Sequence, residues 1–62
     1  MSQVTNYRRT LSRKIVTVTG VANENEALDV ALAYTNETMS SLFNHSVVYL
    51  PPTTFVVTLC TD

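Results

Sequence analysis

Two segments of the chain alternate apolar and polar residues in the way that a β-strand does. Residues 13–21 are rich in β-branched side chains, and residues 55–61 alternate large apolar residues with threonine, valine and cysteine. Such side chains pack well on a pleated, half-buried surface. We therefore predict a strand in each segment, with Gly20 marking the bend at which the first strand ends.

Between these strands the apolar residues recur at a spacing of three and four, which is typical of one face of a helix. Asn23 is a suitable N-cap, Glu26 follows three residues later, and acidic residues favour the positive end of a helix dipole. The pattern predicts a helix from about residue 24 to residue 43, with His45 capping its C-terminal end. The apolar stripe consists of Leu28, Ala31, Leu32, Thr35, Met39, Leu42 and Phe43.

The remaining segments complete a small sheet. Residues 47–50 are a short apolar run, and the prolines at positions 51 and 52 predict a turn, because proline donates no hydrogen bond to a ladder. Residues 1–12 form either a polar basic arm or an extra edge strand, and residues 13–62 form a single domain. The predicted class is α+β, a small antiparallel-rich sheet in the order β-α-β-β with one helix packed on one face.

The small size of the chain favours association with another molecule. A domain of 62 residues buries only roughly 60% of the surface that its unfolded chain exposes. Its single cysteine cannot close an intramolecular disulfide, and one histidine with one cysteine cannot build a structural zinc site. We therefore expect a homodimer or a partner protein to bury part of the sheet.

The predicted sheet lacks the charged residues that usually protect strands from pairing with other chains. No charged side chain occurs from residue 38 to residue 61. If the odd-numbered residues of 55–59 face the helix together with Val48 and Leu50, an uncharged face remains on the other side. A solvated, threonine-rich surface is the alternative to an interface there. The residues predicted to bind a partner on this face are Ile15, Val47, Tyr49, Val56 and Cys60.

Charges are sorted along the chain. All four basic residues precede Ile15 and all five acidic residues follow it, with a net charge of −1. Cationic residues interleaved with a tyrosine are able to neutralise phosphates and stack on bases, although four charges allow only weak binding. A solubilising arm, or an arm folded back on the acids, is the alternative. The predicted nucleic-acid contacts are Tyr7, Arg8, Arg9, Arg13 and Lys14.

The sequence does not predict an enzyme. Cys60 and His45 are candidates for a nucleophile and a base, but nothing in their spacing requires them to meet. We predict no metal, no cofactor and no small-molecule substrate. Residues 1–14 are not followed by the apolar run of a signal peptide, and no apolar run approaches the ~20 residues that span a bilayer. We therefore expect a cytoplasmic protein that does not bind membranes.

The helix and the last strand carry residues that match a known family. They are Glu26, Ala27, Leu28, Ala31, Tyr34, Phe55, Val57, Thr58 and Cys60. With a polar N-terminal tail, a strand, an acid-led helix and a closing hairpin, the chain resembles small bacteriophage host-takeover proteins that inhibit the host RNA polymerase. That family places arginines in its last strand, where this chain has apolar and hydroxyl residues such as Leu59. The resemblance implies a compact viral-type protein that binds a host component in the host cytoplasm.

The predicted function is therefore non-enzymatic protein binding. The chain is expected to act as a phage-type inhibitor or modulator of a host protein, either as a homodimer or by docking on its partner. Two alternatives are a nucleic-acid-binding regulatory protein that uses residues 7–14 and a structural assembly subunit.

Overall fold

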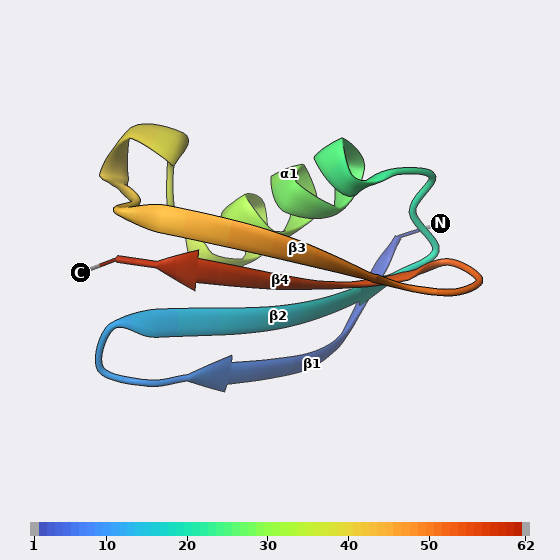
Figure 1. Cartoon of the computed structure of the whole chain (residues 1–62), viewed down its shortest axis with the longest axis horizontal. Coiled ribbons are helices and arrows are strands. Elements are labelled where there is room, and N and C mark those ends of the chain that lie inside the picture. Colours follow the sequence, from blue (N-terminus) through green and yellow to red (C-terminus); the bar gives the residue numbers. More distant parts are fainter. Residues whose placement is uncertain (1, 62) are drawn as a thin grey trace.

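The computed structural model describes residues 2–61, which form a four-stranded antiparallel sheet with one helix on one of its faces (Figure 1). The sheet order β1-β2-β4-β3 places β2 and β4 in the centre and leaves β1 and β3 at the edges. The predicted α+β class is confirmed. The elements are β1 (Gln3–Arg9), β2 (Arg13–Thr19), α1 (Glu24–Thr35), a 3-10 helix η1 (Met39–Ser41), β3 (Asn44–Leu50) and β4 (Thr54–Cys60).

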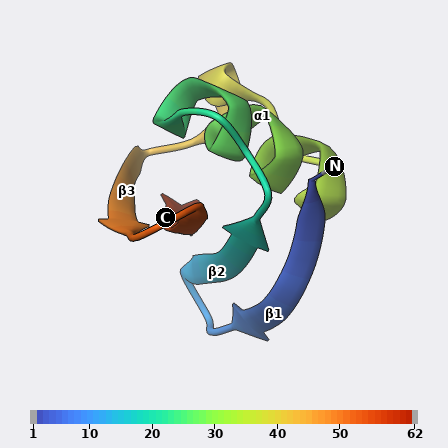
Figure 2. The same ribbon diagram turned by 90° about the vertical axis from the view of Figure 1, so that its right-hand side faces the viewer.

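The core lies between α1 and the two central strands. Ala27 and Ala31 of α1 are fully buried, and these small side chains allow the helix to pack closely on the sheet. Figure 2 shows α1 lying across one face while the opposite face remains uncovered. The other buried residues are Val16, Val18, Val21, Phe55, Val57 and Leu59.

Residues 3–9 form the edge strand β1, which was one of the two alternatives predicted for the N-terminal segment. It pairs antiparallel with β2, and its register shifts between Val4 and Asn6, as a β-bulge does. The ring of Tyr7 packs edge-on against Tyr34 of α1, with 5.3 Å between the ring centroids. Strand β1 is thus attached to the domain both through the sheet and through the helix.

The N-terminal end of α1 agrees with the prediction. The side-chain oxygen of Asn23 accepts a hydrogen bond from the Glu26 N–H at 2.9 Å, and the Glu26 carboxylate accepts one from the Ala22 N–H at 3.3 Å. The first bond satisfies a backbone donor that lacks a partner in the first turn of the helix, and the second ties that turn to the residue before the N-cap. The start of the helix could therefore be predicted from the sequence because it depends on hydrogen bonds between residues close together in the chain.

The predicted C-terminal end of the helix was wrong, because α1 ends at Thr35 and not near residue 43. Asn36 adopts a left-handed conformation, with φ 59° and ψ 36°. The Asn36 N–H donates to the Ala33 carbonyl and the Glu37 N–H donates to the Leu32 carbonyl, which together form a Schellman motif. The rest of the predicted stripe lies outside α1, with Met39 in η1 and Phe43 81% exposed.

Strand β3 starts earlier than predicted and includes His45. This residue therefore lies on an exposed edge strand, not at the end of the helix, so the prediction that it caps the helix was wrong. At the other end of β3, residues 51–53 form the turn into β4 and pair Leu50 with Thr54. Because this turn contains three residues, it determines which face of the sheet each side chain of β3 occupies.

Candidate protein-binding surface

One face of the sheet, which we call the open face, has no helix over it. Its residues are identified by their cross-strand pairing with one another and alternate with the helix-facing residues. They are Gln3, Asn6, Arg8, Arg13, Ile15, Thr17, Thr19, Asn44, Ser46, Val48, Leu50, Thr54, Val56, Thr58 and Cys60.

An apolar cluster lies on the β3 side of the open face. Val48 pairs directly with Val56, and Leu50 follows Val48 two residues along the same strand. Val48 is 52% exposed and Leu50 is 45% exposed, whereas Val56 is half-buried between its neighbours. Two adjacent large apolar side chains with half of their surface in water form a site that a partner could cover.

Threonine hydroxyls surround this cluster, and some of them are already satisfied within the sheet. The hydroxyl oxygens of Thr19 and Thr54, which are cross-strand partners, lie 3.1 Å apart. Hydroxyls that bond within the sheet lose less hydration when a partner covers them. The threonines are therefore compatible with an interface.

The structure brings together three of the five residues predicted to bind a partner. Ile15, Val56 and Cys60 share the open face and are all half-buried. The prediction that Val47 and Tyr49 join them was wrong. These two residues pair with Val57 and Phe55 and therefore lie on the helix side of the sheet, while Val48 and Leu50 take their places on the open face.

The cause of this error is the turn between β3 and β4. With the turn at residues 51–53, Leu50 pairs with Thr54, so residues of equal parity in the two strands share a face. The prediction had assigned opposite parities to the same face. A shift of one residue in register moves every side chain of a strand to the other face. Only the geometry of the turn distinguishes the two cases.

The residues predicted to contact nucleic acid do not form one surface. Tyr7 and Arg9 pair with Val16 and Lys14, which places them on the helix side, whereas Arg8 pairs with Ile15 on the open face. Lys14 is also engaged, because its ammonium lies 3.3 Å from a carboxylate oxygen of Glu37. Arg13 shares the open face with its cross-strand partner Cys60. The basic segment is thus divided between two sides of the sheet.

The candidate catalytic pair is also separated. Cys60 lies on the open face, and His45 pairs with Leu59 and lies on the helix side. Among residues 2–61, no cluster of three His, Cys, Asp or Glu side chains is arranged to hold a metal ion. Within the same residues, no helix has the length and apolarity needed to cross a membrane.

The chain matches no protein-family model, no curated protein and no solved structure. The site is therefore interpreted from its own geometry.

Strand β3 is one of the two edges of the sheet, and the hydrogen-bond pattern of β4 shows which of its backbone groups point outward. The Gly20 N–H donates to the Thr53 carbonyl at 3.1 Å and the Thr61 N–H donates to the Ser12 carbonyl at 2.9 Å, so the odd-numbered residues of β4 bond to β2. Because the ladder alternates, the even-numbered residues of β4 bond to β3. The even-numbered residues of β3 therefore point their backbone groups inward, and those of His45, Val47 and Tyr49 point outward.

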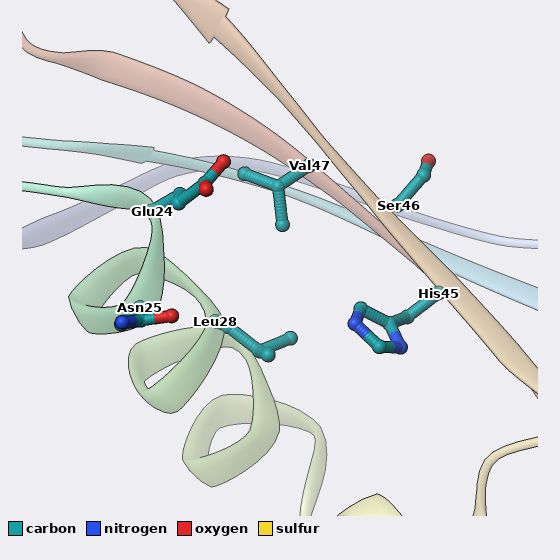
Figure 3. Close-up of a pocket in the computed structure, with 6 residues that line it drawn as sticks. All are labelled: Glu24, Asn25, Leu28, His45, Ser46 and Val47. Carbon is teal, nitrogen blue, oxygen red and sulfur yellow. The ribbon is translucent and has the colours of Figure 1, made fainter.

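A shallow hollow of ≈ 240 Å³ lies beside this edge, between β3 and the first turns of α1 (Figure 3). In Figure 3, Leu28 and His45 face each other across it, with Glu24 and Val47 at its other end. The sequence analysis did not detect this hollow, since its lining comes from two elements far apart in the chain. Its lining residues are Glu24, Asn25, Leu28, His45, Ser46 and Val47.

Proposed function

We propose that the protein is a small, non-enzymatic protein-binding module that uses the open face of its sheet to occupy a surface on another protein. The observation that carries this proposal is the pair Val48 and Leu50, which are half exposed next to Val56 on an otherwise neutral part of the face. Fully burying a valine or leucine side chain contributes about 1.5–3 kcal/mol. A partner that covers the exposed half of both would therefore gain a useful part of its binding free energy there.

The open face has an apolar centre, and its charges are concentrated at one end. Arg8 and Arg13 lie at the end of the face next to the β1–β2 turn. Of the acidic residues, Glu24, Glu26 and Asp29 lie in α1 and Glu37 follows it, on the other layer of the molecule. A partner with an acidic rim beside an apolar patch would complement this arrangement, because complementary charges orient an encounter.

The resemblance to phage proteins that inhibit the host RNA polymerase makes a bacterial protein a reasonable class of target. The divided basic segment weakens the nucleic-acid alternative, since phosphate binding needs its cations on one surface. Protein binding is therefore preferred to nucleic-acid binding as the proposed function, and the experiment below is designed to capture the bound protein.

The test compares two variants with the same added charge. Val56→Lys places a cation at the centre of the open face, and Ala33→Lys places one on the exposed surface of α1. Each is immobilised beside the parent protein and exposed to a bacterial lysate. We expect a protein retained by the parent and by Ala33→Lys to be lost with Val56→Lys. Equal retention by all three would show that the open face does not bind the target.

A further inference from the structure

The outward backbone groups of β3 have a spacing that fits a second copy of the same strand. The strand spans Asn44–Leu50, so Val47 is its midpoint, and the outward residues His45 and Tyr49 lie symmetrically on either side. Two antiparallel strands that are paired about a two-fold axis at Val47 would therefore align over their whole length. Centring the pair at His45 or Tyr49 would leave four of the seven residues in each strand without a partner.

We propose that two copies of the chain pair through β3 about a two-fold axis at Val47 and thereby form one continuous sheet. The Val47 N–H of each copy donates to the Val47 carbonyl of the other. The Tyr49 N–H of each copy donates to the His45 carbonyl of the other, as alternate residues do in an antiparallel ladder. The Val47 and Tyr49 amides are available for this, because no described side chain accepts a bond from either of them.

The side chains of β3 are compatible with this pairing. None of them carries a formal charge at neutral pH with His45 neutral, so the two strands bring no like charges together. The pairing places Tyr49 of one copy across from His45 of the other on the helix side of the sheet. Cross-strand aromatic pairs of this kind stabilise antiparallel ladders.

The exposed ring of Tyr49 and the position of His45 beside the hollow give a second reason for choosing a copy of this chain as the occupant. His45 forms one wall of the hollow, and Figure 3 shows its ring directed toward Leu28 of α1. In the proposed pair, Tyr49 of the second copy lies across from His45, the residue that forms this wall of the hollow. Tyr49 is 53% exposed in the single chain, and its ring packs on Phe55 at 5.0 Å between centroids. The pairing therefore brings an exposed aromatic residue of each copy against His45 of the other.

The opposite edge does not offer the same contact. Strand β1 contains a bulge between Val4 and Asn6 and carries Arg8 and Arg9, and both features discourage pairing with another strand. Pairing of β3 with β1 of another copy would also leave free edges and produce an open chain of molecules. A closed dimer through β3 uses the regular edge of each copy and leaves the protected edges outside.

Pairing through β3 would place both helices on one side of the enlarged sheet and both open faces on the other. Val48 and Leu50 of the two copies would then lie near the centre of one broad surface. The proposed β3 contact does not depend on the proposed function. Only the role of this enlarged open face in binding a partner rests on that function.

The experiment uses N-methylation, which removes one backbone donor and leaves every side chain in place. The full chain is prepared by chemical synthesis with an N-methyl group at Val47, and a control carries it at Arg9, whose backbone groups point outward from β1. Sedimentation equilibrium is measured from the micromolar to the millimolar range. We expect the parent and the Arg9 control to form dimers with a dissociation constant on the order of micromolar. The Val47 compound should bind itself at least about tenfold more weakly.

Amide exchange of the unmodified protein provides a second measurement if the methylated chain folds poorly. Protection of the Val47 and Tyr49 amides should increase with protein concentration, while that of Arg9 should not change. A monomer over the whole range, a series of larger species, or a dimer that ignores methylation at Val47 would overturn the inference.

The two proposals fail in different ways. Target binding that is lost with Val56→Lys in a protein that stays monomeric would leave the proposed function intact and refute the β3 dimer. A β3 dimer that retains no target through its open face would do the reverse.

Discussion

The two edges of this sheet are equally long but are protected very differently. Strands β1 and β3 each have seven residues, and in each an asparagine side chain accepts a bond from the outward N–H that follows it, Asn6 from Tyr7 and Asn44 from His45. Strand β1 adds a bulge and two arginines, whereas β3 keeps an uninterrupted register and no formal charge. A bulge and charged side chains are two of the features that normally protect an edge strand from pairing with other chains. Strand β3 is therefore the less protected of the two edges, and it is the one through which we propose that two copies pair.

Proline substitutions should give the largest effect, and they test which backbone groups of β3 point inward. Val48→Pro removes a donor to β4, so we expect the free energy of unfolding to fall by at least about 2 kcal/mol. His45→Pro removes an outward donor and should cost less than about 1 kcal/mol. Urea denaturation of the two variants measures both values.

Equal losses for the two proline variants would contradict the alternation described for β3. The side chain of Val48 is half exposed and that of His45 is exposed, so neither substitution removes a buried side chain. Since domains of this kind are stabilised by only about 0.05–0.15 kcal/mol per residue, the loss expected for Val48→Pro is a substantial part of the total free energy of unfolding.

Strand β2 and the two ends of helix α1 show what the sequence could and could not predict. Strand β2 and the start of α1 were predicted because their signals are local, namely a β-branched run and the Asn23 cap with Glu26 three residues later. The end of α1 was missed because the apolar spacing continues through Met39 and Leu42, although Asn36 turns the backbone away. The spacing of apolar residues alone does not predict the left-handed conformation of Asn36.

The candidate site was predicted only in part for a related reason. Ile15, Val56 and Cys60 share the open face because β2 and β4 each alternate regularly. Val47 and Tyr49 were placed on the wrong face because their side depends on the turn at residues 51–53, where a change of one residue reverses the assignment. The outward groups of β3 and the adjacent hollow depend on tertiary packing and had no sequence signal.

Substitutions of the aromatic residues on the two edge strands should have smaller effects than the proline substitutions. Tyr7 of β1 packs on Tyr34 of the helix and is 37% exposed, whereas Tyr49 of β3 packs on Phe55 and is 53% exposed. We expect Tyr7→Ala to lower the free energy of unfolding by about 1–2 kcal/mol, because an aromatic pair and its buried area are lost, without changing self-association.

The corresponding change on β3 should act mainly on self-association. Tyr49→Ala should lower stability by less than about 1 kcal/mol, since more of the side chain is already in water, but it should weaken the dimer. Tyr49→Phe is the matched control, because it keeps the ring and removes only the hydroxyl that donates to the Pro52 carbonyl at 2.8 Å. Thermal unfolding and sedimentation equilibrium separate the two effects. An unchanged dimer in Tyr49→Ala would remove this side chain from the contact.

The smallest expected effect comes from the asparagines that the two edges share. The Asn44 side chain accepts a hydrogen bond from the His45 N–H at 2.8 Å, and that N–H is the one that would otherwise donate to the Tyr49 carbonyl of a second copy. Asn44→Ala should therefore strengthen self-association by roughly two- to threefold, in line with the modest net value of one hydrogen bond. Asn6→Ala frees the Tyr7 N–H on β1 in the same way, but the bulge and the arginines should keep that edge inactive. Sedimentation equilibrium at matched concentrations compares the two variants, and equal strengthening in both would mean that the edges differ less than their sequences indicate.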